Sequence, residues 1–217
     1  MFKKIITTGI LISGMMFTGC SEQSEFTENI VQSVEVKKDL LTTLNDAKKI
    51  KVEEKLVSVG AAYNVFADDV KVGEIRGRYV NATGDIFTLT DLDGNVVKSE
   101  KQIKRWGVKL NRLAKVYNKN GNITGYIGEE KIKDAFSWGY KFHFYDDEKV
   151  EIGYSKQKII SLTDVYEVYD MDKNLDYVIE EEVVSLTPSY EIKINDNSNI
   201  RVEDVVLYTA IQNEIDR

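Results

Sequence analysis

The end of the chain carries a predicted helix that has no face suited to water. Residues 205–211 have the sequence VVLYTAI, and the acidic pair Glu203-Asp204 before them favours a helix start. A helix that is apolar on nearly every side must be buried. Because the preceding residues carry strand patterns, we predict that a helix over residues 204–216 passes through the middle of a closed sheet.

From residue 51 onward, apolar and polar residues alternate in short segments, which is typical of antiparallel strands. Asp93-Gly94, Asn120-Gly121 and Asp146-Asp147 supply turn residues that tolerate a positive φ. This regular spacing predicts a mainly β fold, either a sandwich or a barrel. The buried helix favours the closed sheet, an antiparallel barrel of about twelve strands around the C-terminal helix. The predicted strands are residues 52–58, 62–67, 70–79, 85–91, 95–104, 112–118, 122–132, 139–146, 149–159, 164–170, 175–184 and 189–195.

A short pattern recurs three times along these strands. A strand ends at a serine, four residues turn, and a tyrosine begins the next strand with an apolar residue two places later. We interpret this pattern as a reused hairpin unit in which the tyrosine and the apolar residue point to one face. The residues are Ser58, Tyr63 and Val65, then Ser161, Tyr166 and Val168, then Ser185, Tyr190 and Ile192.

Residues 51–217 resemble the tubby C-terminal-like superfamily, and within it the LURP-one-related proteins. The resemblance is carried by the segments EEKLVSVG (residues 53–60) and KQKIISLTDVYEV (residues 156–168) and by the closing helix. It implies a twelve-stranded barrel around a central helix, a fold shared with tubby domains that bind phosphoinositides and with phospholipid scramblases. It implies a fold more directly than an activity.

The first residues have the parts of an export signal: Lys3 and Lys4, then an apolar run from Ile5 to Phe17. The signal ends in FTGC, which resembles the lipobox of bacterial lipoproteins with Cys20 as the acylated residue. A transmembrane anchor is the alternative, but a spanning helix needs roughly 20 apolar residues. We predict a signal peptide at residues 1–19 and a palmitate-type lipid anchor on Cys20, which holds an exported protein to the outer face of the cell membrane, or to an outer membrane if the cell has one.

Between the anchor and the predicted barrel domain (residues 51–217), residues 20–50 are predicted to form a polar tether and then an amphipathic helix. The polar face of this helix carries both charge signs, which favours packing on its own domain over binding a partner or a membrane surface. Its apolar residues are Phe26, Ile30, Val34, Leu40, Leu41, Leu44 and Ala47.

Composition excludes several functions. Loss of Lys3 and Lys4 with the signal changes the formal net charge from −7 to −9, which argues against general nucleic-acid binding. Cys20 is the only cysteine, so one chain contains no disulfide and no cysteine-ligated metal site. A Ser-His pair would need His143, the only histidine, which strand alternation places on the outer surface, opposite Phe142 and Phe144. No Gly-x-Ser-x-Gly motif is present, and we expect neither enzymatic activity nor a cofactor.

Oxygen ligands for calcium are the one metal hypothesis that the sequence supports. Asp170, Asp172, Asn174 and Glu181 stand at positions one, three, five and twelve of a loop like that of an EF-hand. Position six requires glycine but is Leu175, so a β-hairpin turn rich in acceptors is the favoured alternative.

Basic residues gather in one stretch of the predicted sheet and form a candidate anionic-ligand patch. It is interpreted as a contact for anionic lipid or an anionic polymer, with Trp106 at the interface; the alternative is a solvated strand edge protected by charge. The predicted function is therefore a membrane-anchored lipoprotein whose barrel domain binds lipid or an anionic envelope component, and a protein-interaction module of the envelope is the alternative. The patch consists of Arg76, Arg78, Lys101, Lys104, Arg105, Trp106, Lys109 and Arg112.

Overall fold

The structure of the protein is a computed structural model that describes residues 39–56, 58, 60–78, 86–103, 113–128, 141–158, 163–182, 187–195 and 198–215. These residues all belong to one compact unit, Lys37–Arg217. Its described helices are α1 (Leu40–Asp46) and α3 (Val202–Ile215). Its described strands are β1 (Lys49–Glu54), β2 (Ala62–Ala67), β3 (Val70–Arg78), β4 (Ile86–Asp91), β5 (Val96–Ile103), β6 (Leu113–Asn118), β7 (Ile123–Gly128), β8 (Lys141–Tyr145), β9 (Glu151–Gln157), β10 (Val165–Asp170), β11 (Leu175–Glu181) and β12 (Ser189–Ile194).

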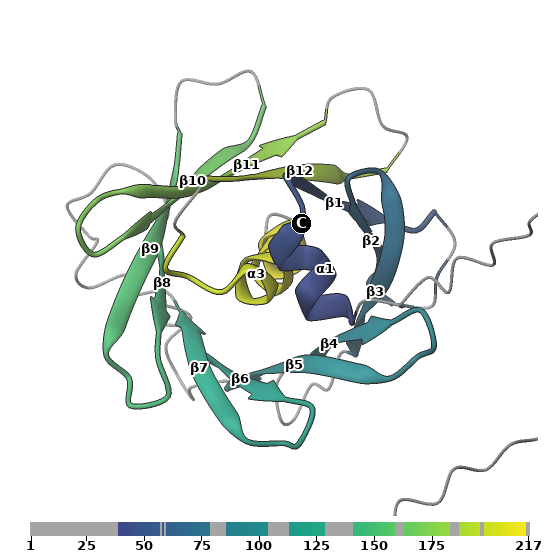
Figure 1. Ribbon diagram of the computed structural model, residues 1–217, viewed down its shortest axis with the longest axis horizontal. Helices are drawn as coiled ribbons and strands as arrows, with labels where there is room; N and C mark the ends of the chain where they lie inside the picture. The colour runs from purple at the N-terminus through teal and green to yellow at the C-terminus, as the bar shows by residue number, and fades with distance from the viewer. Residues whose placement is uncertain are drawn as a thin grey trace, which may run out of the picture. The chain divides into compact units, whose positions relative to one another are not determined.

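The strands close into one antiparallel barrel in chain order, and β1 completes the ring by pairing with β12 (Figure 1). The predicted twelve-stranded barrel is confirmed. The first strand differs from its prediction, because β1 begins at Lys49 instead of residue 52. The alternation already starts there: Ile50 and Val52 are fully buried while Lys49 and Lys51 are half-buried. The predicted domain boundary at residue 51 therefore falls inside β1.

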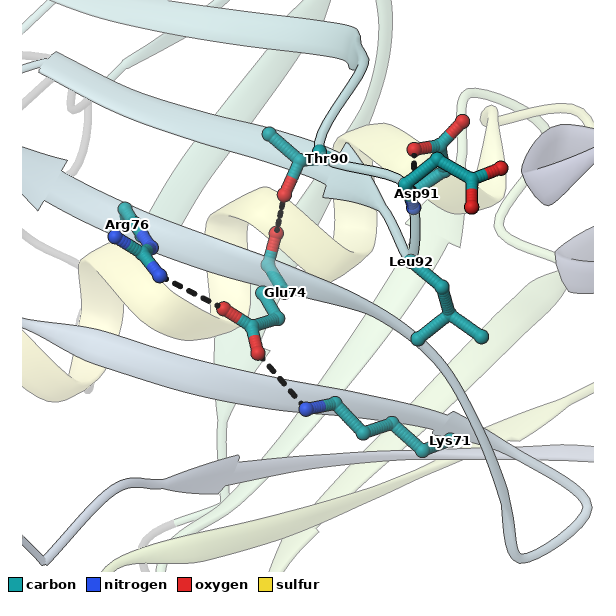
Figure 2. Close-up of a pocket in the computed structure, with 8 residues that line it drawn as sticks. Lys71, Glu74, Arg76, Thr90, Asp91 and Leu92 are labelled. Atoms are coloured by element: carbon teal, nitrogen blue, oxygen red, sulfur yellow. Dashed lines mark hydrogen bonds and ion pairs between the residues drawn. The ribbon is translucent and has the colours of Figure 1, made fainter.

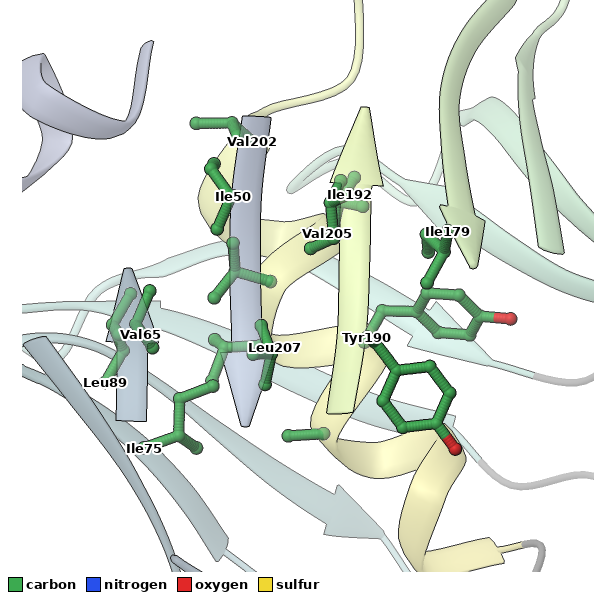
Figure 3. Close-up of a cluster of buried hydrophobic side chains, with 14 of the residues drawn as sticks. Ile50, Val65, Ile75, Leu89, Ile179, Tyr190, Ile192, Val202, Val205 and Leu207 are labelled. Carbon is green, nitrogen blue, oxygen red and sulfur yellow. The ribbon is translucent and has the colours of Figure 1, made fainter. Parts of the chain in front are cut away.

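Helix α3 passes through the middle of the ring of strands, as predicted for residues 204–216 (Figure 1). Every residue from Val202 to Asn213 is buried, which explains why this helix needs no polar face. Inward side chains of the barrel, including Ile50 and Ile192, form one buried cluster with residues of α3 such as Val205 (Figure 3). On the other side of the helix, the rings of Phe142 and Phe144 lie 5.2 and 5.5 Å from the ring of Tyr208.

The recurring tyrosines all point into the barrel and bind the last turns of α3. The hydroxyl of Tyr63 accepts a hydrogen bond from Asn213 Nδ2 at 2.9 Å, and the hydroxyl of Tyr190 donates to Asn213 Oδ1 at 3.3 Å. Gln212 Nε2 donates to the hydroxyl of Tyr166 at 3.4 Å. The predicted common face is confirmed, and the pattern serves to hold the helix. The apolar residues two places later, Val65, Val168 and Ile192, are fully buried.

Helix α1 lies in the C-terminal part of the segment predicted to hold an amphipathic helix, and it packs against the barrel interior. Asp39 caps it by accepting the N–H of Thr42 at 3.1 Å, and Leu40 and Leu44 join the buried core. Leu40 lies against Gly73 of β3, where an added Cβ would come 3.2 Å from Leu40 Cδ2. The predicted apolar positions 26, 30 and 34 lie outside the described residues. Within the described part of the chain, neither helix is long and apolar enough to cross a membrane.

One end of the barrel, which we call the turn end, consists of the tight turns that join β2 to β3, β4 to β5, β6 to β7, β8 to β9 and β10 to β11. The opposite end, where β3 ends at Arg78 and β5 ends at Ile103, we call the loop end. Helix α3 begins at the turn end, because it follows β12, and it runs toward the loop end.

Four hairpins at the turn end share one design. In the turn after β4, Asp91 Oδ1 accepts the N–H groups of Asp93 and Asn95 at 2.9 and 2.8 Å, and Gly94 has a φ of 83°. The predicted positive φ at Asp93-Gly94 and Asn120-Gly121 is confirmed, whereas in the turn at Asp146-Asp147 it falls on Lys149. Asn118, Asp146 and Asp170 close the other three turns, and Gly121, Lys149 and Lys173 have positive φ there.

Candidate functional site

The described part of the predicted basic patch lies on the outer face of β3 and β5. Arg76 and Arg78 alternate along β3 with Ile75, which is buried, and are themselves exposed. Lys101 alternates in the same way with buried Glu100 on β5. The remaining predicted members, Lys104, Arg105, Trp106, Lys109 and Arg112, lie outside the described residues.

Strand register places three cations in one line across the outer face. Arg78 lies opposite Ile86, Ile86 opposite Lys101, and Lys101 opposite Lys115 of β6. We call Arg78, Lys101 and Lys115 the basic row. Lys115 was missed from the sequence, although its position between buried Ala114 and Val116 marks it as outward-facing.

The basic row has no ion-pair partner among the described residues, whereas several other outward-facing cations of the barrel do. Lys49 of β1 also lies directly opposite a lysine, Lys193 of β12, but a carboxylate serves each of them. Lys49 Nζ lies 3.1 Å from Asp69 Oδ1, and Lys193 Nζ lies 2.6 Å from Glu180 Oε2. Like charges directly opposite each other destabilise a sheet. The uncompensated pair in the basic row therefore presents a place for an anion.

Arg76 belongs to a separate network around Glu74. Glu74 accepts Lys55 Nζ at 2.7 Å, Lys71 Nζ at 2.8 Å and Arg76 at 3.3 Å. The hydrogen bonds from Lys55 and then Lys71 lower the pKa of Glu74 to about 2. Figure 2 shows Lys71 and Arg76 on either side of this carboxylate.

The Glu74 network borders a hollow of about 510 Å³ toward the turn end (Figure 2). Its other wall is the turn after β4, in which Asp91 is already engaged by backbone N–H groups. The carboxylates and cations around the hollow thus bind one another or their own turn. We regard this hollow as structural rather than as a ligand site.

The barrel interior holds a group of buried charges that the sequence did not predict. Lys98 of β5 forms ion pairs with Glu203 Oε1 at 3.0 Å and with Asp204. Arg201 Nε donates to Asp204 Oδ2 at 3.2 Å, and its other nitrogen reaches the carbonyl of Thr124. These contacts fasten the first turn of α3 to the barrel wall.

Glu100 completes the interior group but has no cation of its own. It is 1% exposed, between the cross-strand partners Phe87 and Val116, and its Oε2 has no hydrogen-bond partner among the described residues. Burial, and then the charge of Asp204, raise the pKa of Glu100 well above the ordinary value. The register of β5 explains its position, because a bulge opposite Leu89 and Thr90 turns Lys98 and Glu100 inward.

The structure separates the residues of the calcium hypothesis. Asp170 and Asn174 bind each other, since Asp170 Oδ1 accepts the N–H of Asn174 at 2.8 Å and Oδ2 accepts its Nδ2 at 2.9 Å. Glu181 ends β11 at the other end of the hairpin, beside Asp164. Asp172 lies in the exposed turn. The favoured hairpin is confirmed, and the described residues contain no group of three carboxylate, histidine or cysteine side chains arranged to hold a metal.

His143 is not the surface residue that the sequence predicts. It does lie on the face opposite Phe142 and Phe144, but it is only 6% exposed. Its Nδ1 lies 2.6 Å from Glu151 Oε1, and its ring lies 6.5 Å from that of Tyr154 across the strand pair. Neighbouring aromatic side chains on the outer face cover it, which alternation alone could not reveal.

The same outer region carries stacked tyrosines. Tyr154 of β9 and Tyr169 of β10 are cross-strand partners with ring centroids 5.6 Å apart and planes 24° apart. Both are half-buried, and Tyr145 of β8 lies in the same region. We call Tyr145, Tyr154 and Tyr169 the tyrosine face. Cys20, the predicted lipidation site, lies outside the described residues.

Comparison with known proteins supports the architecture. No family model matches the chain, and no curated protein matches its sequence. A solved X-ray structure of a protein from Arabidopsis thaliana is similar to this chain with a TM-score of 0.50 and 10% identity, covering 79% of this chain and 94% of that one. At this identity the similarity concerns the fold alone, so the chain shares its barrel architecture with that plant protein.

Proposed function

We propose that the protein is an exported lipoprotein, held by lipid on Cys20 to the outer face of the cell membrane, or to an outer membrane where the cell has one. Its barrel domain is non-enzymatic and binds an anionic ligand, either a lipid head group or another anionic envelope component. The anchor rests on the export signal and the FTGC sequence of residues 17–20.

The observation that carries the ligand proposal is the basic row. Its three cations lie in one line across β3 to β6 and have no carboxylate partner among the described residues, although the mature chain is acidic overall. An anion bound between Lys101 and Lys115 would relieve their repulsion and form charge-assisted hydrogen bonds.

We further propose that the barrel domain belongs to the tubby-like superfamily, in the LURP-one-related branch. The barrel around a C-terminal helix and the fold similarity to the plant protein agree with this membership. The recurring tyrosines support it from within the chain, because Tyr166 lies in the segment that carries the sequence resemblance and also binds α3.

Flotation of residues 21–217 with vesicles of increasing anionic lipid content, with and without calcium, tests the ligand proposal. We expect the affinity for the vesicles to rise with their anionic lipid content. The triple variant Arg78→Glu, Lys101→Glu and Lys115→Glu should bind at least about 100-fold more weakly, because each cation contributes about 1 kcal/mol near an anionic surface. The matched control reverses Lys156 and Lys158, which are exposed on β9 and just after it, away from the basic row and from the turn end. Equal binding by the basic-row variant and its parent would remove the basic row as the site.

The tyrosine face favours a second candidate, a protein-interaction module of the envelope. Tyrosine is enriched at protein interfaces, and Tyr154 and Tyr169 present half-buried, stacked rings on the outside of the barrel. In this case Tyr154→Ser with Tyr169→Ser would abolish retention of an envelope protein, whereas the basic-row variant would retain it. Loss of retention in the basic-row variant alone would instead point back to an anionic partner.

A further inference from the structure

Exposed apolar side chains of the barrel gather at the turn end. Among the described residues, the exposed large apolar side chains are Leu56, Val70, Leu92, Val96, Val150 and Met171, and all but Leu56 belong to this end. They come from four different hairpins, those that join β2 to β3, β4 to β5, β8 to β9 and β10 to β11. Because these hairpins follow one another around the closed ring, the side chains are distributed along a rim.

The turns hold these side chains in place. Leu92, 55% exposed, follows Asp91, whose carboxylate closes the turn by accepting backbone N–H groups. Met171, 52% exposed, follows Asp170, which closes its turn in the same way. Leu92 and Met171 therefore sit on turns that hydrogen bonds hold in one conformation. Their side chains are exposed because the folded turns keep them there.

The N-terminal part of the described chain joins the barrel at the same end. Asp39 and Leu40 begin α1 beside Gly73, and the N–H groups of Lys48 and Lys49 bind Asp68 in the turn between β2 and β3. The stretch between the proposed lipid anchor on Cys20 and Asp39 spans at most about 65 Å when fully extended. The connection to the proposed anchor therefore enters the barrel at the turn end.

From these observations we infer that the turn end rests on the membrane that holds the anchor, with Val70, Leu92, Val150 and Met171 in contact with the bilayer interface. The inference rests on the proposed lipid anchor. Apolar side chains spread along a rim suit a plane better than a compact protein patch. Together they bury apolar area that would otherwise face water.

Charge at the turn end specifies the kind of lipid surface. Exposed acids outnumber exposed cations in the five turns of this end, so an anionic surface would gain no net attraction there. The acids are Asp68, Asp69, Asp93, Asp147, Glu148 and Asp172, and the cations are Lys119, Lys149 and Lys173. The contact is accordingly apolar and favours uncharged or zwitterionic lipid. The basic row lies toward the loop end, at Arg78 and Lys101, so this orientation directs it away from the anchoring membrane.

Site-specific fluorescence on the full lipidated chain in phosphatidylcholine vesicles tests the inference. A single cysteine at Leu92 or Met171 carries an environment-sensitive dye, and Leu56, 73% exposed at the loop end, provides the matched control site. Acylation consumes the thiol of Cys20, so only the introduced cysteine reacts. Lipids bearing a nitroxide near the head group should quench the dyes at Leu92 and Met171 several-fold more than the dye at Leu56, and adding phosphatidylglycerol should reduce that difference. Equal quenching at all three sites would overturn the inference.

Flotation of the same vesicles separates this inference from the anchor on which it rests. A chain that fails to float shows that the lipid anchor is absent, whereas a chain that floats without selective quenching contradicts only the rim contact. In the chain labelled at Leu92, a triple variant should abolish the selective quenching. It combines Val70→Asp, Val150→Asp and Met171→Asp. Because these side chains are exposed, circular dichroism should stay unchanged, and quenching that persists in this variant would also overturn the inference.

Discussion

Strand β5 carries charged side chains on both of its faces, and the lysines on the two faces have different surroundings. Inside the barrel, Lys98 is nearly inaccessible and meets two carboxylates from the first turn of α3. Outside, three residues further along, Lys101 faces Lys115 with no carboxylate partner among the described residues. The inner charges therefore help hold α3 to the barrel wall, whereas Lys101 has no such contact among the described residues.

The largest effect is expected from an inner charge that has no partner. Ile211 of α3 is 2% exposed, and Ile211→Asp would place a carboxylate there with no cation to meet it. We expect the free energy of unfolding to fall by at least about 4 kcal/mol, a large part of the roughly 5–15 kcal/mol of an ordinary domain. Urea unfolding measures this, with Ile211→Val, about 1 kcal/mol, as the control. If Ile211→Asp melts like its parent, α3 is not central to the barrel.

Removing the inner cation comes next. Lys98→Met leaves Glu203 and Asp204 buried beside an apolar side chain, which should cost about 3–5 kcal/mol. The same change on the outer face, Lys101→Met, should alter stability by less than about 0.5 kcal/mol. Chemical denaturation of the two variants tests the contrast between the faces directly, and similar losses would break it.

Glu100 makes the inner face sensitive to pH. Because burial and then Asp204 raise its pKa in the folded state, the folded barrel holds a proton more tightly than the unfolded chain does. The resulting stability is fully present below the unfolded pKa of about 4.5 and is lost as pH rises through the folded pKa. Glu100→Gln should flatten this decline of stability with pH. Melting curves recorded from pH 4 upward measure the effect, with Lys101→Gln as the control that should keep the parent's dependence of stability on pH.

The smallest effect on stability is expected at the basic row. Lys115→Glu replaces a repulsive cross-strand pair with an attractive one, so stability should rise by no more than about 0.5 kcal/mol. Calorimetry at low and high salt measures the change, and the gain should shrink as salt screens the pair. A loss above about 1 kcal/mol would mean that Lys115 supports the fold and would weaken its assignment to a ligand.

The periodicity of apolar residues predicted most of the architecture, because each strand or helix must place its apolar side chains on the buried side. The alternation in each strand and the apolar sequence of residues 205–211 both reflect which side chains must leave water, and the closed barrel follows from combining them. Tyr63, Tyr166 and Tyr190 could be recognised as one repeated feature for the same reason. Their hydrogen bonds to Asn213 and Gln212 could not be predicted, because these bonds depend on where the helix ends relative to the strands.

The functional residues were harder to predict, since they depend on register and on neighbours. The bulge that turns Lys98 and Glu100 inward leaves no mark in the sequence of β5. Lys115 became a candidate only through its alignment with Lys101 across two strands. His143 was assigned to the correct face but the wrong exposure, because Tyr145 on the same strand and Tyr154 on β9 cover it.

The pairing of the first strand with the last has a consequence for how the protein is made. β1 bonds to β12, and α3 follows β12, so the barrel cannot close around its helix until almost all of the chain is available. Such non-local pairing folds slowly. If the chain is exported as proposed, this delay would keep the polypeptide unfolded while it crosses the membrane, and the fold would be completed on the far side. A chain that terminates before β12 would lack both the closing strand and the core, and would be expected to be degraded rather than to persist as a partial barrel.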